Sequence, residues 1–178
     1  MPNVSRLSRF LSWVCTILIV ALPVLTVVVW MNFETFGSEL RRGIGIECGT
    51  PLPTELLPVQ IVLGIGVMML PTSVKVFGLW HLRRLLAAFA DGRVYTAENI
   101  RALRLFAWAV AGSIALGMLM VPLLSVILTF DNPPGQRVLV FGIGSDDFMA
   151  LFVSGVFALI AHTMEFGRSL ASENAEFV

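Results

Sequence analysis

Four long apolar runs are the feature that most restricts how this chain can fold. They cover residues 10–30, 59–80, 105–130 and 148–164, to within a few residues. A helix needs about 20 consecutive apolar residues to cross the hydrocarbon core of a bilayer. Hydrophobic residues make up 57% of the chain and charged residues 13%, whereas charged residues make up about a quarter of a soluble domain. The sequence therefore predicts an all-α membrane protein, a single domain over residues 1–178, built as a bundle of four transmembrane helices in two hairpins.

The first run is expected to stay in the protein as a transmembrane helix. It is longer than the usual signal-peptide core of about 7–15 residues, and the VVVWMNFETFG sequence at its end contains no small-x-small cleavage site.

The charged residues between the runs predict the orientation of the helices. Short cytoplasmic loops carry an excess of lysine and arginine. Nine such residues would lie on one side: Arg6, Arg9, Lys75, Arg83, Arg84, Arg93, Arg101, Arg104 and Arg168. Three would lie on the other: Arg41, Arg42 and Arg137. We therefore expect both termini and the loop 81–104 in the cytoplasm, with 31–58 and 131–147 as exterior loops.

The exterior loops carry turn signals and two short strand-like segments. Glycines and prolines through 37–58 predict a loop with little room for a long helix. GIGIE in the first loop and RVLVF in the second are candidate strand segments. A small exterior β-pairing between them is one alternative, and two unpaired loops are the other.

The loop 81–104 is expected to form a helix, a tight break and a second helix. Apolar residues recur with helical spacing from Leu82 to Phe89, and Asp91-Gly92 is a stop signal. Thr96 is a candidate N-cap, with Glu98 in the first turn of the next helix. The arginines that we expect to bind a cytoplasmic partner also lie here: Arg83, Arg84, Arg93 and Arg101. The alternative is that they only orient the chain and bind anionic headgroups.

Two eight-residue segments resemble each other. GRVYTAEN at 92–99 and GRSLASEN at 167–174 share their first two and last two residues, and each follows an even-numbered apolar run. One interpretation is a parallel repeat of two helix hairpins. The other is two copies of one membrane-exit device, consisting of a helix-stopping glycine, a basic anchor and a capping sequence.

These segments also carry a family resemblance. FADGRVYTAENIRALR at 89–104 and the tail at 167–174 resemble a bacterial family of four-span inner-membrane proteins, catalogued as domain of unknown function 2975, over almost the whole chain. The resemblance implies the inner membrane and no known enzyme activity. It also implies a partner, since genes of the family often lie beside a small Cro-like helix-turn-helix regulator. The tail departs from the family pattern, because it reads SENA rather than the more acidic Glu-Glu-Asn-Asp type.

Residues that could carry chemistry are few. His162 and Glu165 share a helix face, and an intramembrane pair of this kind could relay protons or hold a metal. With His81 as the only other histidine, a coordination shell cannot be filled, so anchoring or a local hydrogen bond is the favoured role. Ligation of one haem by the two histidines is the alternative. Cys15 and Cys48 are expected to be free thiols. No catalytic, cofactor-binding or metal-binding residue is predicted.

Small residues recur every fourth position in the last two runs. Such stripes let helix backbones approach closely inside a membrane. They predict packing faces, against a helix of this chain or of a second copy in a homo-oligomer. The residues are Ala107, Ala111, Ala115, Ala150, Ser154 and Ala158.

The sequence favours a non-enzymatic membrane anchor or sensor for a cytoplasmic partner, and the family resemblance implies that this partner is a small helix-turn-helix regulator. Direct binding of nucleic acid is not expected. A small transporter or channel component is one alternative, and it would need polar groups along a path near the midplane. A haem or quinone redox protein is the other, and it would need paired thiols or axial histidines.

Overall fold

The computed structural model describes residues 2–44, 56–93, 96–133, 135–142 and 144–176. They form five helices: α1 (Pro2–Met31), α2 (Phe33–Ile44), α3 (Pro58–Ala90), α4 (Ala97–Thr129) and α5 (Ser145–Glu176). Four of them, α1, α3, α4 and α5, are long and apolar enough to cross a membrane. The predicted all-helical membrane fold is therefore confirmed.

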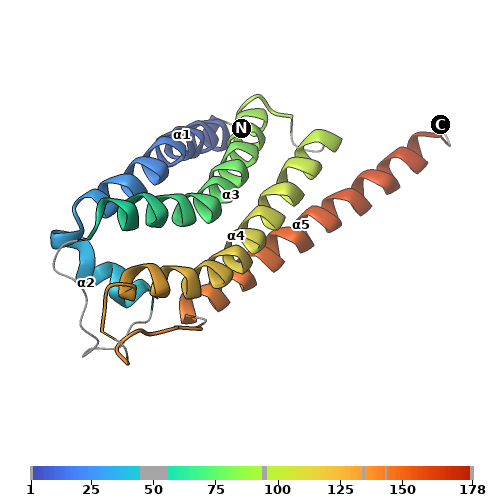
Figure 1. Cartoon of the computed structure of the whole chain (residues 1–178). Helices are drawn as coiled ribbons and strands as arrows, with labels where there is room; N and C mark the ends of the chain where they lie inside the picture. Colours follow the sequence, from blue (N-terminus) through green and yellow to red (C-terminus); the bar gives the residue numbers. More distant parts are fainter. Residues whose placement is uncertain (1, 45–55, 94–95, 134, 143, 177–178) are drawn as a thin grey trace.

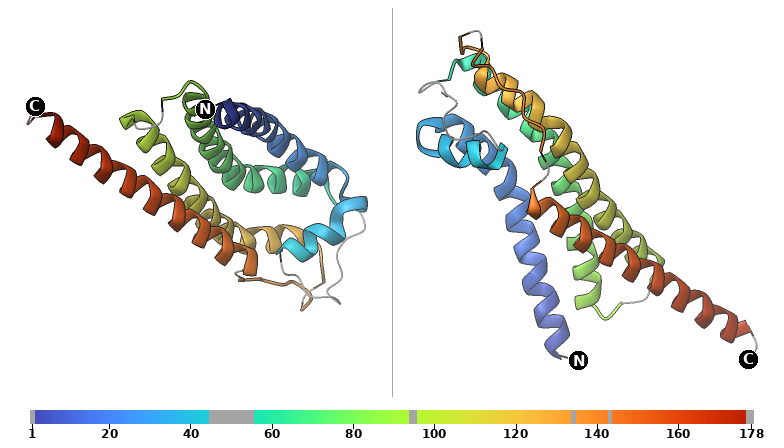
Figure 2. Two further views of the ribbon diagram at one scale, coloured as in Figure 1. Left: turned by 180° about the vertical axis from the view of Figure 1, so that it is seen from behind. Right: turned by 90° about the horizontal axis from the view of Figure 1, so that it is seen from below.

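The four long helices lie side by side in a curved row (Figures 1 and 2). α1 packs on α3, α3 on α4, and α4 on α5. The hairpins α1–α3 and α4–α5 are thus joined through the α3–α4 contact. Within the part of the chain that the structure describes, α5 packs on α4 alone, so α5 forms one edge of the row.

The short helix α2 occupies part of the first predicted exterior loop. It packs on α1 and α4, and it buries Phe33, Leu40 and Ile44 in a cluster that also contains side chains of α3. Their spacing of seven and four residues places them on one face of a helix. Turn-forming glycines at 37 and 43 obscured this amphipathic pattern in the sequence, and Gly37 is itself buried on the same face.

The exterior β-pairing does not form among the described residues. Gly43 and Ile44 of GIGIE belong to α2, and residues 45–47 lie outside the described residues. RVLVF runs along the end of α4 instead. The N–H of Val138 donates to the Thr129 hydroxyl (3.2 Å) and that of Val140 to the Ser125 hydroxyl (3.1 Å). These hydroxyl groups of α4 thus accept main-chain hydrogen bonds that a partner strand would otherwise accept.

Candidate functional site at the arginine-rich end

One end of the molecule gathers most of its positive charge. The start of α1, the turn between α3 and α4, and the C-terminal part of α5 all lie toward this end (Figure 2). We call it the arginine-rich end and define it by Arg6, Arg9, Arg83, Arg84, Arg93, Arg101, Arg104 and Arg168. The opposite end carries α2 and the segment 131–142.

Tryptophans mark a level just inside the arginine-rich end. Each of three long helices places an arginine nearer the end and a tryptophan one turn deeper. The pairs are Arg9 and Trp13, Arg84 and Trp80, and Arg104 and Trp108. All three indole rings are exposed, at 70%, 44% and 68% respectively, which fits the aromatic belt at a membrane surface. This tryptophan level was not predicted, although the four-residue spacing between each arginine and tryptophan is readable in the sequence.

Hydrogen bonds close both ends of the turn between α3 and α4. Gly92 has a positive φ of 79°, its N–H bonds to the carbonyl of Phe89, and the N–H of Arg93 bonds to that of Ala88. This is the Schellman pattern of a helix C-terminus. The Thr96 hydroxyl accepts from the N–H of Asn99, and the Asn99 amide donates back to the carbonyl of Arg93. The predicted stop and N-cap are both confirmed.

A cavity of about 690 Å³ lies between the end of α3 and the start of α4. Of the four arginines predicted to bind a partner, Arg84, Arg93 and Arg101 line it. Asp91 and Glu98 line it too, and Asp91 forms a 3.3 Å ion pair with Arg93. The fourth predicted arginine, Arg83, does not line this cavity.

Arg83 lies beside the indole ring of Trp80, with its guanidinium carbon 5.6 Å from the ring centre. Arg84 contacts the same ring at 5.9 Å. Two arginine guanidinium groups therefore lie near Trp80 where α3 leaves the predicted membrane level, since a guanidinium is attracted to an aromatic face.

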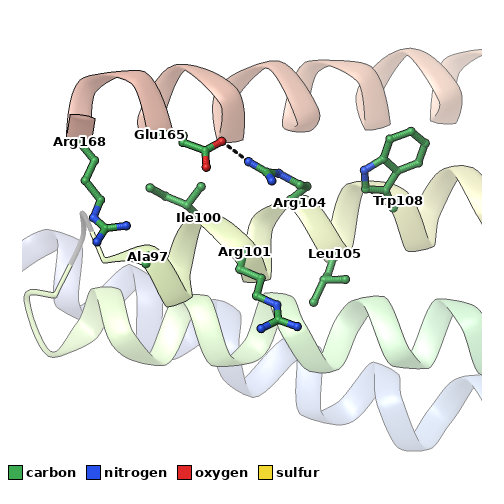
Figure 3. A pocket seen from close by; sticks show the side chains of 8 residues that line it. All are labelled: Ala97, Ile100, Arg101, Arg104, Leu105, Trp108, Glu165 and Arg168. Atoms are coloured by element: carbon green, nitrogen blue, oxygen red, sulfur yellow. Dashed lines mark hydrogen bonds and ion pairs between the residues drawn. The ribbon is translucent and has the colours of Figure 1, made fainter. Parts of the chain in front are cut away.

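A second cavity, of about 380 Å³, lies between α4 and α5 (Figure 3). Arg104 of α4 reaches Glu165 of α5 and forms an ion pair with it. Arg168 extends from α5 toward Ala97, the first residue of α4, while Arg101 extends on the side of α4 away from α5. Ile100, Leu105 and Trp108 also line this cavity.

Glu165 does not form its ion pair with a residue of its own helix. Glu165 bonds across to Arg104, and the His162 side chain is exposed. His81 lies against Phe77, with Nδ1 2.9 Å from the Phe77 carbonyl oxygen. Among the residues that were placed, no group of three or more histidine, cysteine or acidic side chains could hold a metal ion.

The small-residue stripes meet at one strong contact. Ala107 and Ser154 are both buried, and they lie where α4 touches α5. Ala111, Ala150 and Ala158 are half-buried, whereas Ala115 is exposed. Ala161, outside the predicted stripe, is fully buried beside Leu103 and Ala102.

The two similar segments have different structures. The first contains the stop at Gly92, but Gly167 of the second lies inside α5, which runs unbroken to Glu176. The interpretation of two identical membrane-exit devices is therefore wrong for the second copy.

Comparison with known proteins identifies a family but no characterised relative. A family model described as "Protein of unknown function (DUF2975)" matches residues 50–178, which is well over half of the chain. No curated protein matches the chain. No solved structure matches it either.

Proposed function

The chain belongs to the DUF2975 family of proteins of unknown function, and on that premise we propose that it is a membrane anchor or sensor that holds a water-soluble partner at its arginine-rich end. In this proposal that end and both termini lie in the cytoplasm, and the membrane is the bacterial inner membrane. The nine-to-three distribution of lysine and arginine between the two sides supports this orientation.

One observation carries the proposal, namely the folded hairpin that extends beyond the tryptophan level. α3 continues for a further ten residues from Trp80 to Ala90, which is roughly 15 Å at 1.5 Å per residue. A connection that only returned the chain to the membrane would need about 2–8 residues. The Schellman turn ends α3 and the Thr96 cap starts α4 at defined residues, and such preorganisation lowers the entropy cost of docking a partner.

The charge on the hairpin indicates the chemistry of the partner. Among the described residues, no acidic side chain forms an ion pair with Arg84 or Arg101. Both side chains of the pair of Arg93 and Asp91 are more than 60% exposed. The ion pair is therefore weak, and an acidic group of a partner could replace Asp91. An acidic protein surface would complement this cavity.

We take the partner to be a small helix-turn-helix regulator, because genes of the resembled family often lie beside one. Such a regulator would present an acidic face to the hairpin and keep its basic DNA-binding face free. No nucleic acid would then contact the membrane protein.

The test purifies the small helix-turn-helix regulator that the family resemblance leads us to expect beside the gene, and measures its binding to the full chain in nanodiscs of phosphatidylcholine. A neutral lipid removes attraction to the bilayer itself. We expect Arg84→Gln with Arg93→Gln to weaken binding by about ten-fold, which corresponds to about 1.4 kcal/mol. Salt should weaken the wild-type complex, since both side chains are exposed.

The matched control is Arg104→Gln with Arg168→Gln, which removes the same charge from the other cavity. It should leave binding of the regulator nearly unchanged. Equal affinity for the wild type and the Arg84/Arg93 variant, or no binding by the wild type, would refute the proposal.

A further inference from the structure

We propose that the smaller cavity, between α4 and α5, binds the phosphate group of an anionic phospholipid. The inference is independent of the docking proposal, because Arg104, Glu165 and Arg168 line this cavity and not the larger one. Arg101 lines both cavities and is left out of the tests below.

The cavity collects more positive than negative charge. Two guanidinium groups, from Arg104 and Arg168, face the single carboxylate of Glu165, whereas the Arg101 side chain extends to the far side of α4. That carboxylate is already paired with Arg104. Among the described residues, no acidic group pairs with Arg168. A phosphate would supply the missing anion, and its oxygens match the planar donors of a guanidinium.

The direction of Arg168 supports an anion at this place. Its side chain reaches from α5 toward Ala97, at the start of α4 (Figure 3). A helix start carries a partial positive charge, which the Thr96 cap and Glu98 in the first turn partly offset. An anion between Ala97 and Arg168 would be attracted mainly by the Arg168 guanidinium, and the ion pair between Arg104 and Glu165 forms the neighbouring wall.

The position of the cavity relative to the membrane indicates a lipid as the source of the phosphate. Trp108 lines the cavity one helical turn deeper than Arg104, with 68% of its surface exposed, and tryptophan favours the headgroup level. Leu105 adds an apolar surface beside it. A headgroup at the arginines would leave its acyl chains beside these two residues. Basic pockets between transmembrane helices bind anionic headgroups in this way.

The edge position of α5 gives a lipid access to the cavity. α5 packs on α4 and on no other helix in the described part of the chain. A lipid could therefore reach the groove between the two helices from the side, without displacing a third helix.

The experiment titrates the full chain in mild detergent with phosphatidylglycerol, phosphatidylcholine or inorganic phosphate, and counts bound molecules by native mass spectrometry. We expect phosphatidylglycerol to bind more tightly than phosphatidylcholine. Arg104→Gln with Arg168→Gln should weaken phosphatidylglycerol binding by about 30-fold, at about five-fold for each charge near a membrane surface. Arg84→Gln with Arg93→Gln, an equal loss of charge at the larger cavity, should leave it nearly unchanged.

A second variant keeps the test decisive if the double variant folds poorly. Glu165→Gln removes the competing carboxylate and frees Arg104, so it should strengthen phosphatidylglycerol binding by about five-fold. Unchanged or weaker binding by this variant would overturn the proposal. So would equal binding of the two lipids, or equal losses in both double variants, which would indicate general attraction of charge. Displacement of the lipid by a similar concentration of inorganic phosphate would assign the cavity to a soluble ligand and overturn the lipid assignment.

Discussion

The hydroxyl of Ser154 on α5 donates a 2.7 Å hydrogen bond to the main-chain carbonyl oxygen of Ala107 on α4. Both residues are buried, at 5% and 1% exposure. A side-chain hydroxyl can reach a main-chain oxygen of the next helix only if the two backbones lie close, as small residues permit. This contact therefore fixes the edge helix α5 on the rest of the row.

The first prediction concerns that contact. Ser154→Leu should lower the stability of the protein in detergent by about 1–3 kcal/mol, because the larger side chain overpacks the α4–α5 contact. Ser154→Ala should cost only about 0.6 kcal/mol, the average for a hydrogen bond between helices in a membrane. Thermal unfolding followed by circular dichroism measures both changes. Ala115→Leu is the matched control, since Ala115 belongs to the α4 stripe but is exposed. Equal losses at positions 115 and 154 would contradict the assignment.

The second prediction concerns the contact between α1 and α3. The indole ring of Trp30 is fully buried against Gly64, and a Cβ added at Gly64 would lie 2.2 Å from that ring. Gly64→Ala should therefore cost about 1–3 kcal/mol through overpacking. Gly66→Ala, on the same helix with no neighbour within 4 Å of an added Cβ, should instead stabilise by up to about 1 kcal/mol through helix propensity. Denaturant or thermal unfolding should show changes in stability of opposite sign for the two variants. A change of the same sign in both would show that the Trp30 ring moves to accommodate the added Cβ.

The third prediction separates the two similar segments. Gly92→Ala should destabilise the α3–α4 turn by about 1–2 kcal/mol, because φ at Gly92 is +79° and a Cβ disfavours the left-handed region. Gly167→Ala should be neutral or stabilising, since Gly167 lies within α5 and an added Cβ meets nothing within 4 Å. Hydrogen exchange of the turn amides should rise only in the Gly92 variant. A similar rise in the Gly167 variant would mean that α5 also breaks at its glycine.

The fourth prediction concerns the orientation of the protein. In a background with Cys15→Ala and Cys48→Ala, Gln136→Cys should react with an impermeant thiol reagent on intact cells. Asp91→Cys should react only after permeabilisation. Both positions are exposed, and both avoid the adjacent glycines with positive φ, Gly92 and Gly135. Labelling of position 91 but not position 136 on intact cells would reverse the orientation and remove the cytoplasmic docking proposal.

Much of the fold was predictable because each helix that crosses a membrane needs one continuous apolar segment of sufficient length, and such segments can be read directly from a sequence. Apolar runs of spanning length identified all four long helices. The turn at 91–96 was equally local, because a glycine in the left-handed region and a threonine cap act within a few residues of themselves. The short helix α2 was not predicted, because glycines at 37 and 43 lie within its apolar pattern and glycines also indicate loops.

The candidate site was predictable only as a list of charges. The sequence by itself determined that arginines gather at one end of the helices, because that follows from their order along alternating spans. Only the tertiary structure decided how they divide, with Arg84 and Arg93 on the α3–α4 cavity and Arg104 and Arg168 on the α4–α5 cavity. It also decided that Glu165 faces Arg104 rather than His162. These pairings depend on the rotation of each helix about its axis, which is set by long-range packing such as that of Ser154 on Ala107, and no local pattern in the sequence encodes it.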